Sequence, residues 1–336
     1  GVVWDSYTPP GRGRHGFDFW YSYGCCDDHN HPHYWTGDAP IDQPIRVDEW
    51  STIHETDVAI DYLRNTDGRR DPDKPFALFV APNPPHMPFS QVPERYRELY
   101  ADTSPEELAT WENLTETGFE KIRGDIADYY AMISGVDDQF GRLLSVLEET
   151  GLDDETVVIY TSDHGDMMGS HGLVRKTHWY DESLLVPFLV RHPDSERTGE
   201  TDDAILSAID LFPSLLSLLG LSEAVPDDLD GTDCSARIID GVSPGPAEAL
   251  YMHIRPEDST NGRRGIRTDR YTYAFEKQDG RVDHYTIDNE NDPHQMRNVY
   301  GEDAERDRDL QHRLCRLLLR ARDPFAEWFR SEASLD

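Results

Sequence analysis

The sequence has little positive charge and very little lysine. Of its 336 residues, 66 are acidic and 32 are lysine or arginine, so the formal net charge is -34 at neutral pH. Lysine occurs only as Lys74, Lys121, Lys176 and Lys277. A chain this acidic repels polyanions, which argues against nucleic acid and anionic membranes as partners. An acidic surface richer in arginine than lysine is typical of proteins from salt-loving organisms, where salt screens the self-repulsion, and we expect such a source.

Cysteines and long apolar runs are also scarce. The four cysteines are Cys25, Cys26, Cys234 and Cys315, and their spacing fits neither a zinc site nor a disulfide framework. No apolar run approaches the roughly 18 residues that span a membrane. Residues 1–20 lack the charged, apolar and cleavage regions of a signal peptide. These absences favour a cytoplasmic location.

Apolar periodicity indicates a chain of alternating helices and strands. Helical spacing predicts helices over residues 49–65, 124–150, 204–219 and 303–322, and apolar runs predict buried strands over 76–80 and 157–160. This alternation is typical of an α/β fold with a mixed or parallel sheet flanked by helices. Short strands over 250–254, 265–267, 271–275 and 284–287, followed by the last helix, predict a small antiparallel sheet with a covering helix. We therefore expect a domain over 1–225 and a C-terminal subdomain over 226–336, with a linker or surface loop over 222–248.

Side chains that suit a metal and an anion follow the strand predicted at 157–160. Asp163 and His164 end that strand, and Lys176 and His178 come soon after. In a parallel α/β sheet, ligands collect at the carboxyl ends of the strands. Oxygen and nitrogen ligands followed by a cation suit an anionic substrate held on a divalent metal. His86 lies in a rigid proline-rich loop after the other strand. Each motif alone is more often a turn or a rigid loop, so the prediction depends on their joint occurrence.

Other histidines in the sequence are interpreted as structural residues. His29, His31 and His33 are interrupted by a proline and have no accompanying carboxylate or cysteine spacing, so we interpret them as loop residues and not as a metal site. The aromatic and histidine-rich segment 21–35 is our candidate for the rim of a substrate site. His171, in Gly-Ser-His-Gly, is interpreted as a hydrogen-bonding residue of its loop.

Several segments together resemble the sulfatases of the alkaline phosphatase superfamily. The stretch 161–173, with Lys176 and residues 180–187, resembles the core of that family. Residues 84–89 look like its histidine loop, 264–271 like a C-terminal strand motif, and 285–293 like its closing element. The resemblance implies an alkaline phosphatase-like fold, with residues 1–225 as the catalytic domain.

The resemblance also implies roles for individual residues. Asp163 and His164 would ligate Ca²⁺. Because calcium favours oxygen donors, Mg²⁺ or Mn²⁺ stays open. Lys176 would contact an oxygen of the sulfate ester, and His86 would donate a hydrogen bond or a proton to the bridging oxygen. We also expect His178 to line the same pocket and bind substrate, although the resemblance assigns it no established family role.

One part of the family pattern is missing from this sequence. Sulfatases use a Cys or Ser in a Cys/Ser-x-Pro/Ala-x-Arg motif, oxidised to formylglycine, as the nucleophile, and no such motif occurs here. Asp27 and Asp28 are a poor substitute for the family's N-terminal aspartate pair, because no apolar strand precedes them. We therefore expect the C-terminal part of a sulfatase, without about the first hundred residues of a typical domain and inactive alone.

The expected reaction is metal-dependent hydrolysis of an organic sulfate monoester, on a small molecule or a carbohydrate. Three alternatives stay open. The chain could belong to a phosphonate or phosphodiester hydrolase of the same superfamily. It could be a non-catalytic binding module that kept the fold. A separate partner chain could also supply the missing N-terminal segment.

Overall fold

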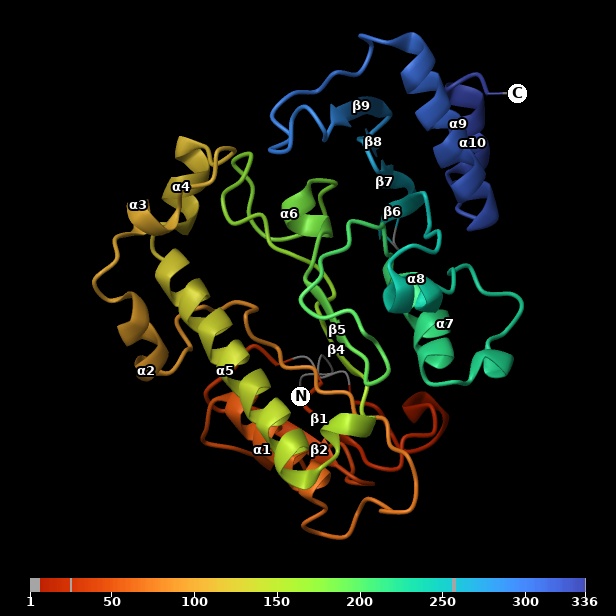
Figure 1. Cartoon of the computed structure of the whole chain (residues 1–336). Coiled ribbons are helices and arrows are strands. Elements are labelled where there is room, and N and C mark those ends of the chain that lie inside the picture. Colours follow the sequence, from red (N-terminus) through yellow and green to blue (C-terminus); the bar gives the residue numbers. More distant parts are fainter. Residues whose placement is uncertain (1–6, 25, 256–257, 336) are drawn as a thin grey trace. The chain divides into compact units, whose positions relative to one another are not determined.

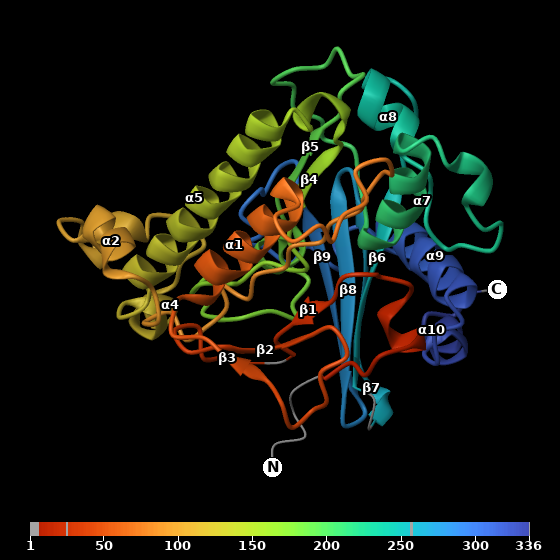
Figure 2. The same ribbon diagram turned by 90° about the horizontal axis from the view of Figure 1, so that it is seen from below.

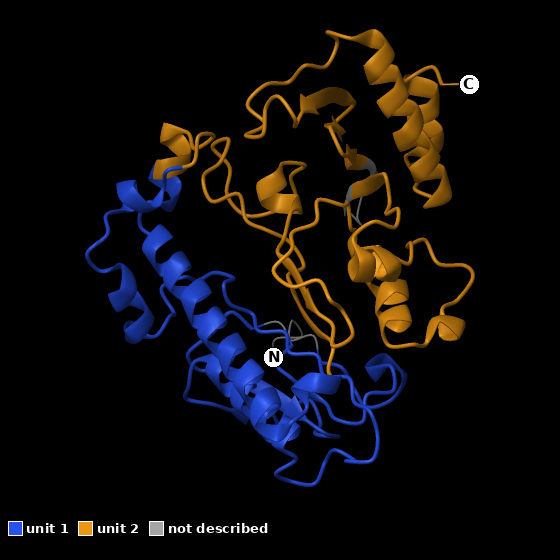
Figure 3. Cartoon of the chain, viewed as in Figure 1, with its two compact units in different colours: residues 1–110, 120–155 blue, residues 111–119, 156–336 orange. Residues whose placement is uncertain are grey.

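The computed structural model describes residues 7–24, 26–255 and 258–335, which form two compact units (Figure 3). The first unit comprises residues 1–110 and 120–155, and the second comprises 111–119 and 156–336. These units do not coincide with the domains expected at 1–225 and 226–336, because residues 156–225 group with the C-terminal residues. The functional division of the chain at residue 225 stays a prediction.

Two long helices dominate the first unit. Helix α1 (Ser51–Arg64) packs against α5 (Ile126–Thr150), as Figure 1 shows, and both helices were predicted from apolar spacing. A Cβ on Gly135 would lie 2.7 Å from the Trp50 ring, so a glycine inside α5 permits the close approach of the residue that precedes α1. Gly151 ends α5 with a φ of 68°, a left-handed conformation that glycine adopts without strain.

Short elements complete the first unit. They are η1 (Arg12–Arg14), β1 (Tyr21–Ser22), β2 (His33–Thr36), β3 (Ile45–Arg46), α2 (Glu94–Arg97), η2 (Glu98–Tyr100), α3 (Pro105–Leu108), α4 (Glu116–Ile122, shared with the second unit) and η3 (Asp153–Glu155). Strands β1, β2 and β3 form a small antiparallel sheet. Helix α3 begins after Ser104, whose side chain accepts a hydrogen bond from the backbone N–H of Glu107 in a capping box.

The buried strand predicted over residues 76–80 is not found. The segment is irregular, and the Phe79 side chain is 69% exposed. An apolar run indicates the capacity to form a strand, but a strand also needs hydrogen-bonded neighbours.

The strand predicted over 157–160 exists, but its surroundings differ from the prediction. Strand β4 (Val158–Thr161) pairs antiparallel with β5 (Phe188–Arg191), and both are only partly buried. Every strand pairing within the described ranges is antiparallel, so the parallel pairing that we expected around the site is not found there. An apolar run carries no information on the direction of its partner strand. The chain is a mixed α/β protein.

The C-terminal sheet agrees with the prediction. Strands β6 (Glu248–Arg255), β7 (Asp258–Thr268), β8 (Tyr271–Gln278) and β9 (Arg281–Asp288) form an antiparallel meander in sequence order. Helices α9 (Ala304–Arg320) and α10 (Ala326–Glu332) cover one face of it (Figure 2), and α10 was not predicted. The shared core consists of apolar side chains that are almost fully buried: Ile266, Tyr273, Phe275, Leu310, Leu314, Leu318 and Phe329.

Four helical elements complete the second unit: the first lies between β4 and β5, and the other three lie between β5 and β6. They are α6 (Asp181–Leu184), α7 (Ala208–Leu218), η4 (Ser222–Ala224) and α8 (Ser235–Asp240). Helix α7 begins four residues later than predicted, because Ser207 and Asp210 form a capping box there. Helices η4 and α8 lie in the segment expected to be a loop. No helix in the described part of the chain has the length and apolar character to cross a bilayer.

Candidate active site

Asp163 and His164 lie on the loop that follows β4, in the second unit. Oδ1 of Asp163 accepts a hydrogen bond from the His164 backbone N–H at 3.0 Å, which turns Oδ2 toward the imidazole. The His164 Nδ1–H donates to the Gly165 carbonyl at 2.8 Å, so the Nε2 lone pair is available as a ligand. Asp163 Oδ2 and His164 Nε2 lie 3.4 Å apart. At that separation both atoms can lie about 2.3 Å from one cation.

The backbone of α6 supports this pair from behind. The Gly165 N–H donates to the Ser183 carbonyl at 3.0 Å. A Cβ on Gly165 would lie 2.0 Å from the Glu182 carbonyl oxygen, so no side chain fits at this position. The glycine of the Asp-His-Gly motif therefore brings the loop after β4 into backbone contact with α6.

A compact loop leads from this pair to Lys176. Oδ1 of Asp166 accepts hydrogen bonds from the backbone N–H groups of Met168 at 2.9 Å and Arg175 at 3.0 Å, which folds residues 166–175 back on themselves. Asp166 was not identified from the sequence, although it lies within the motif. Glycine packing seats the loop on residues 111–119, because a Cβ on Gly118 would lie 1.9 Å from the Gly169 carbonyl oxygen.

Lys176 is half-buried at the end of this loop. Among the described residues, no carboxylate lies within ion-pair distance of its ammonium group. By contrast, Lys74 pairs with Asp71 at 3.2 Å and Lys277 lies 3.9 Å from the centre of the Trp328 ring. In a chain with twice as many acids as bases, an ammonium without a carboxylate partner is suited to an external anion.

Two further histidines of the motif lie near α6. The backbone N–H of His178 donates to Ser183 Oγ at 3.4 Å, and the His178 ring is half-buried. Its contact with substrate stays a prediction. The His171 ring stacks on Tyr180 with centroids 3.8 Å apart and lies 3.1 Å from the Asn113 amide nitrogen, so it supports its loop as expected. Burial lowers the pKa of His171, which keeps the ring neutral.

Asn113 is a supporting residue that the sequence did not reveal. It is 2% exposed, and its amide also donates to Glu182 Oε1 and to the His294 carbonyl at 3.1 Å. Its backbone carbonyl accepts a hydrogen bond from the His171 N–H at 2.8 Å. Asn113 lies in an irregular polar segment, where no periodicity could identify it, whereas Glu182 is part of the recognised motif.

His86 lies in the first unit, between the cis bonds Pro84–Pro85 and Met87–Pro88. Its Nδ1–H donates to the Met87 carbonyl at 2.8 Å, which leaves Nε2 as the nitrogen available for chemistry. Asp27 Oδ1 lies 3.6 Å from His86 Nδ1. Asp27 is thus a neighbour of the histidine loop, a role that the sequence did not indicate.

The neighbouring histidines resemble a structural support more than a metal site. His29 is 1% exposed and its Nε2–H donates to the His86 carbonyl at 2.9 Å. Burial lowers the pKa of His29, so the ring is neutral. The proposed rim at 21–35 is only partly accessible, because Tyr34 and Trp35 are buried. His29 therefore supports the backbone of His86, whose catalytic role stays a prediction.

The metal-ligand set within the described ranges is incomplete. No group of three or more His, Cys, Asp or Glu side chains there is arranged to hold a metal ion. Asp163 and His164 fit a divalent cation as two of its ligands, because a carboxylate oxygen and an unprotonated imidazole nitrogen converge. Calcium takes about six to eight ligands, most of them oxygen.

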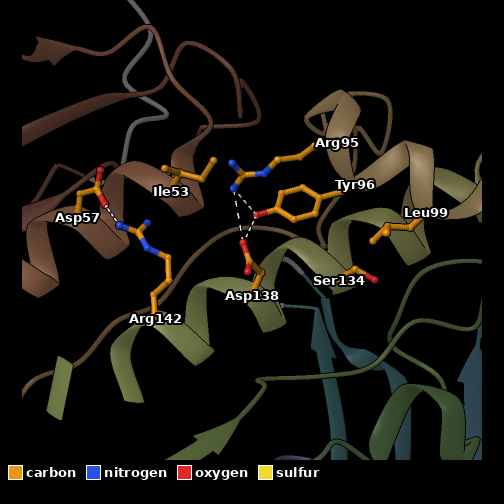
Figure 4. A pocket seen from close by; sticks show the side chains of 8 residues that line it. All are labelled: Ile53, Asp57, Arg95, Tyr96, Leu99, Ser134, Asp138 and Arg142. Carbon is orange, nitrogen blue, oxygen red and sulfur yellow. Dashed lines mark hydrogen bonds and ion pairs between the residues drawn. The ribbon is translucent and has the colours of Figure 1, made fainter. Parts of the chain in front are cut away.

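A hollow of the first unit is lined by other residues. It has a volume of about 650 Å³ and is lined by Ile53, Asp57, Arg95, Tyr96, Leu99, Ser134, Asp138 and Arg142 (Figure 4). Its charged groups neutralise one another, since Arg142 pairs with Asp57 at 2.5 Å and Asp138 accepts from the Tyr96 hydroxyl at 2.6 Å. It contains none of the predicted site residues.

A carboxylate–imidazole pair and an ammonium on one supported loop suit the hydrolysis of an anionic ester. Comparison with known proteins agrees. The sulfatase family model matches residues 3–221, and the model for the C-terminal region of N-sulphoglucosamine sulphohydrolase matches residues 169–323. The chain belongs to the sulfatase family.

Individual relatives support this assignment. An endo-4-O-sulfatase of Bacteroides thetaiotaomicron is 36% identical over 96% of this chain and 66% of its own length. An ulvan-active sulfatase of Formosa agariphila is 32% identical over 88% of this chain and 56% of its own length. The crystal structure of the sulfatase yidJ from Bacteroides fragilis superposes with a TM-score of 0.89 at 35% identity, covering 96% of this chain and 70% of that one. The fold is thus alkaline phosphatase-like, and the chain spans between half and two thirds of the length of these two curated relatives.

Proposed function

We propose that this chain supplies part of the active site of a metal-dependent sulfatase that hydrolyses a sulfate monoester on a carbohydrate. The observation that carries the proposal is the single folded loop that holds both the Asp163–His164 pair and the unneutralised ammonium of Lys176. The relatives support the carbohydrate class, since they include an endo-4-O-sulfatase, an ulvan-active sulfatase and an N-acetylglucosamine-6-O-sulfatase.

Asp163 and His164 would hold the cation, which we propose to be Ca²⁺, with Mg²⁺ or Mn²⁺ as alternatives because one donor is nitrogen. When bound, the cation would supply positive charge that offsets the negative charge of the sulfate oxygens. The tautomer of His164 supports this role, because the Gly165 carbonyl retains the proton on Nδ1.

Lys176 and His86 would act on the ester itself. The Lys176 ammonium would neutralise charge that develops on the sulfate oxygens as the S–O bond breaks. His86 would donate a hydrogen bond or a proton from Nε2 to the bridging oxygen, because its Nδ1–H is already engaged by the Met87 carbonyl. His178 would complete the substrate contacts from the same loop as Lys176.

The nucleophile would come from polypeptide outside this sequence. The family uses formylglycine, and this chain contains no Cys/Ser-x-Pro/Ala-x-Arg motif from which it could be made. We therefore propose that the chain alone does not turn over a sulfate ester, and that a preceding segment or a partner chain completes the site. The acidic surface fits a sulfated polymer only at the high ionic strength of a halophilic setting.

The test compares the chain alone with the chain extended by the coding sequence upstream of Gly1, using an aryl sulfate and a sulfated oligosaccharide. We expect hydrolysis only in the extended protein, and a loss of at least about a hundredfold in Asp163→Ala and Lys176→Ala. Asp137→Ala, which removes an exposed carboxylate from α5, is the control and should retain full activity. Undiminished turnover by Lys176→Ala would exclude the proposed role, and absence of turnover in the extended protein would favour a binding module.

A second candidate is phosphonate or phosphodiester hydrolysis. The phosphonate monoester hydrolase of Agrobacterium radiobacter superposes with a TM-score of 0.63 at 26% identity, over 81% of this chain and 61% of that one. Rates of the extended protein on matched 4-nitrophenyl sulfate and phenylphosphonate esters separate the two functions. A higher kcat/KM for the phosphonate would overturn the sulfatase assignment.

A further inference from the structure

The backbone around Lys176 has an unusual conformation. The residues on either side of it, Arg175 and Thr177, have φ values of 68° and 76°. These left-handed values are unfavourable for residues with a Cβ, and most of all for a β-branched residue such as threonine. Such a conformation persists only where surrounding contacts hold it.

The contacts that hold the first of these residues lie within the loop itself. The Arg175 N–H donates to Asp166 Oδ1 at 3.0 Å, and the Arg175 carbonyl accepts from the Met167 N–H at 2.7 Å. Both partners lie within the preceding ten residues. The loop therefore fixes Arg175 without help from the C-terminal sheet.

The contact that holds Thr177 comes from the C-terminal sheet. Arg263 Nη1 donates to the Thr177 carbonyl at 2.7 Å. Arg263 lies on β7 directly opposite Glu276 on β8, and its Nε and Nη2 contact Glu276 Oε1 at 2.8 and 2.7 Å. The guanidinium also lies 5.7 Å from the centre of the Trp179 ring. Both charged side chains are mostly buried, which strengthens these charge-assisted hydrogen bonds.

We propose that Arg263 is a positioning residue for Lys176. Its guanidinium divides its donors between Glu276, which orients it, and the Thr177 carbonyl, which it holds, a geometry that lysine cannot reproduce. The C-terminal sheet thereby determines where the Lys176 ammonium lies. The inference rests on the proposed function of Lys176, but the position of that side chain can be measured independently of catalysis.

The scarcity of lysine makes the test specific. Reductive methylation with ¹³C-formaldehyde labels four lysines and the N-terminus, and Lys176→Arg identifies the signal of interest. We expect the Lys176 signal of the unmutated chain to shift when sodium sulfate is added at constant high ionic strength. In Arg263→Ala it should move toward the position of an unstructured lysine, and its apparent Kd for sulfate should rise about tenfold.

The controls distinguish positioning from a general loss of structure. Lys277 lies over Trp328, so its ring-shifted signal reports whether the C-terminal sheet is intact. Arg270→Ala removes a comparable two-bond pair with Asp288, at 3.0 and 2.7 Å, and should leave Lys176 unchanged. If Arg263→Ala also displaces the Lys277 signal, the milder variant Glu276→Gln provides the test. This variant weakens the pair that orients Arg263, so we expect the Lys176 signal to move in the same direction as in Arg263→Ala, but by less.

Each outcome bears on one claim. The positioning role is overturned if the Lys176 signal has the same position in Arg263→Ala as in Arg270→Ala while the Lys277 signal is unchanged. If Arg263→Ala disturbs the sheet, the positioning role is overturned when the Lys176 signal is unchanged in Glu276→Gln. A Lys176 signal that ignores sulfate in the unmutated chain counts against the proposed function, whereas its displacement in Arg263→Ala would still support positioning.

Discussion

At the scale of single residues, close backbone packing determines where the candidate metal ligands lie. Gly165 follows Asp163 and His164 directly and packs against the backbone of α6, where a Cβ would lie 2.0 Å from the Glu182 carbonyl oxygen. Because both partners are backbone, neither can move aside by a change of rotamer. The pair therefore depends on the absence of a side chain at the next residue.

Replacing Gly165 by alanine should destabilise the chain by about 1–3 kcal/mol, because the loop and α6 must separate to accept the methyl group. Gly141→Ala is the matched control, since Gly141 is an exposed residue of α5 and a Cβ there meets nothing within 4 Å. It should stabilise the chain by about 0.5–1 kcal/mol, as expected inside a helix. Urea unfolding measures both free energies, and effects of the same sign would contradict the packing argument.

At the scale of elements, helix α1 carries a carboxyl group in an apolar setting. Glu55 Oε1 accepts a hydrogen bond from the Tyr34 hydroxyl on β2 at 2.8 Å, whereas Oε2 is buried without a partner among the described residues. Burial raises the pKa of Glu55 to about 8, against the opposing effect of the Tyr34 hydrogen bond. The folded chain therefore holds a proton on Glu55 that the unfolded chain releases near its usual pKa of 4.5.

This proton makes folding pH-dependent in a defined direction. As pH rises from 4.5 to 8, the unfolded state loses the proton first, so Glu55 reduces the free energy of unfolding by at most about 1.4 kcal/mol per pH unit. Glu55→Gln should remove this loss, so the variant should gain stability relative to the unmutated chain between pH 5 and pH 9. Urea unfolding at several pH values tests it, with Glu148→Gln on the exposed side of α5 as control. A difference that stays constant with pH would refute the raised pKa.

At the scale of the whole molecule, net charge is the dominant physical property. With 66 acidic and 32 basic residues, the folded chain repels itself at low ionic strength. Many arginines are already paired with nearby carboxylates, such as Arg197 with Glu200 at 2.7 Å and Arg237 with Asp202 at 2.8 Å. These local pairs leave a large unbalanced negative charge that salt must screen.

Stability should therefore rise with salt. The screening length falls from about 10 Å at 0.1 M to about 3 Å at 1 M, and we expect Tm to increase by about 5 °C or more over that range. Sucrose at matched osmolality is the control, because it favours compact states without screening charge. A Tm that is flat or falls with sodium chloride while rising with sucrose would contradict both the charge argument and the proposed halophilic source.

The sequence by itself determined the two long helices of the first unit and the family of this protein. Helices α1 and α5 follow from apolar spacing, which is a local property. The candidate residues Asp163, His164 and Lys176 lie in one short sequence motif, so they could be identified from the sequence alone. Their assigned roles, like that of His86, stay predictions.

Only the tertiary structure decided the direction of the β4–β5 pairing, the exposure of Phe79 and the contact between Arg263 and Thr177. Arg263 and Thr177 are 86 residues apart in the sequence. Side-chain periodicity indicates which face of an element is apolar, but it does not predict which distant backbone group an arginine will contact. That meeting is set by the register of β7 on β8, a non-local property of the folded chain.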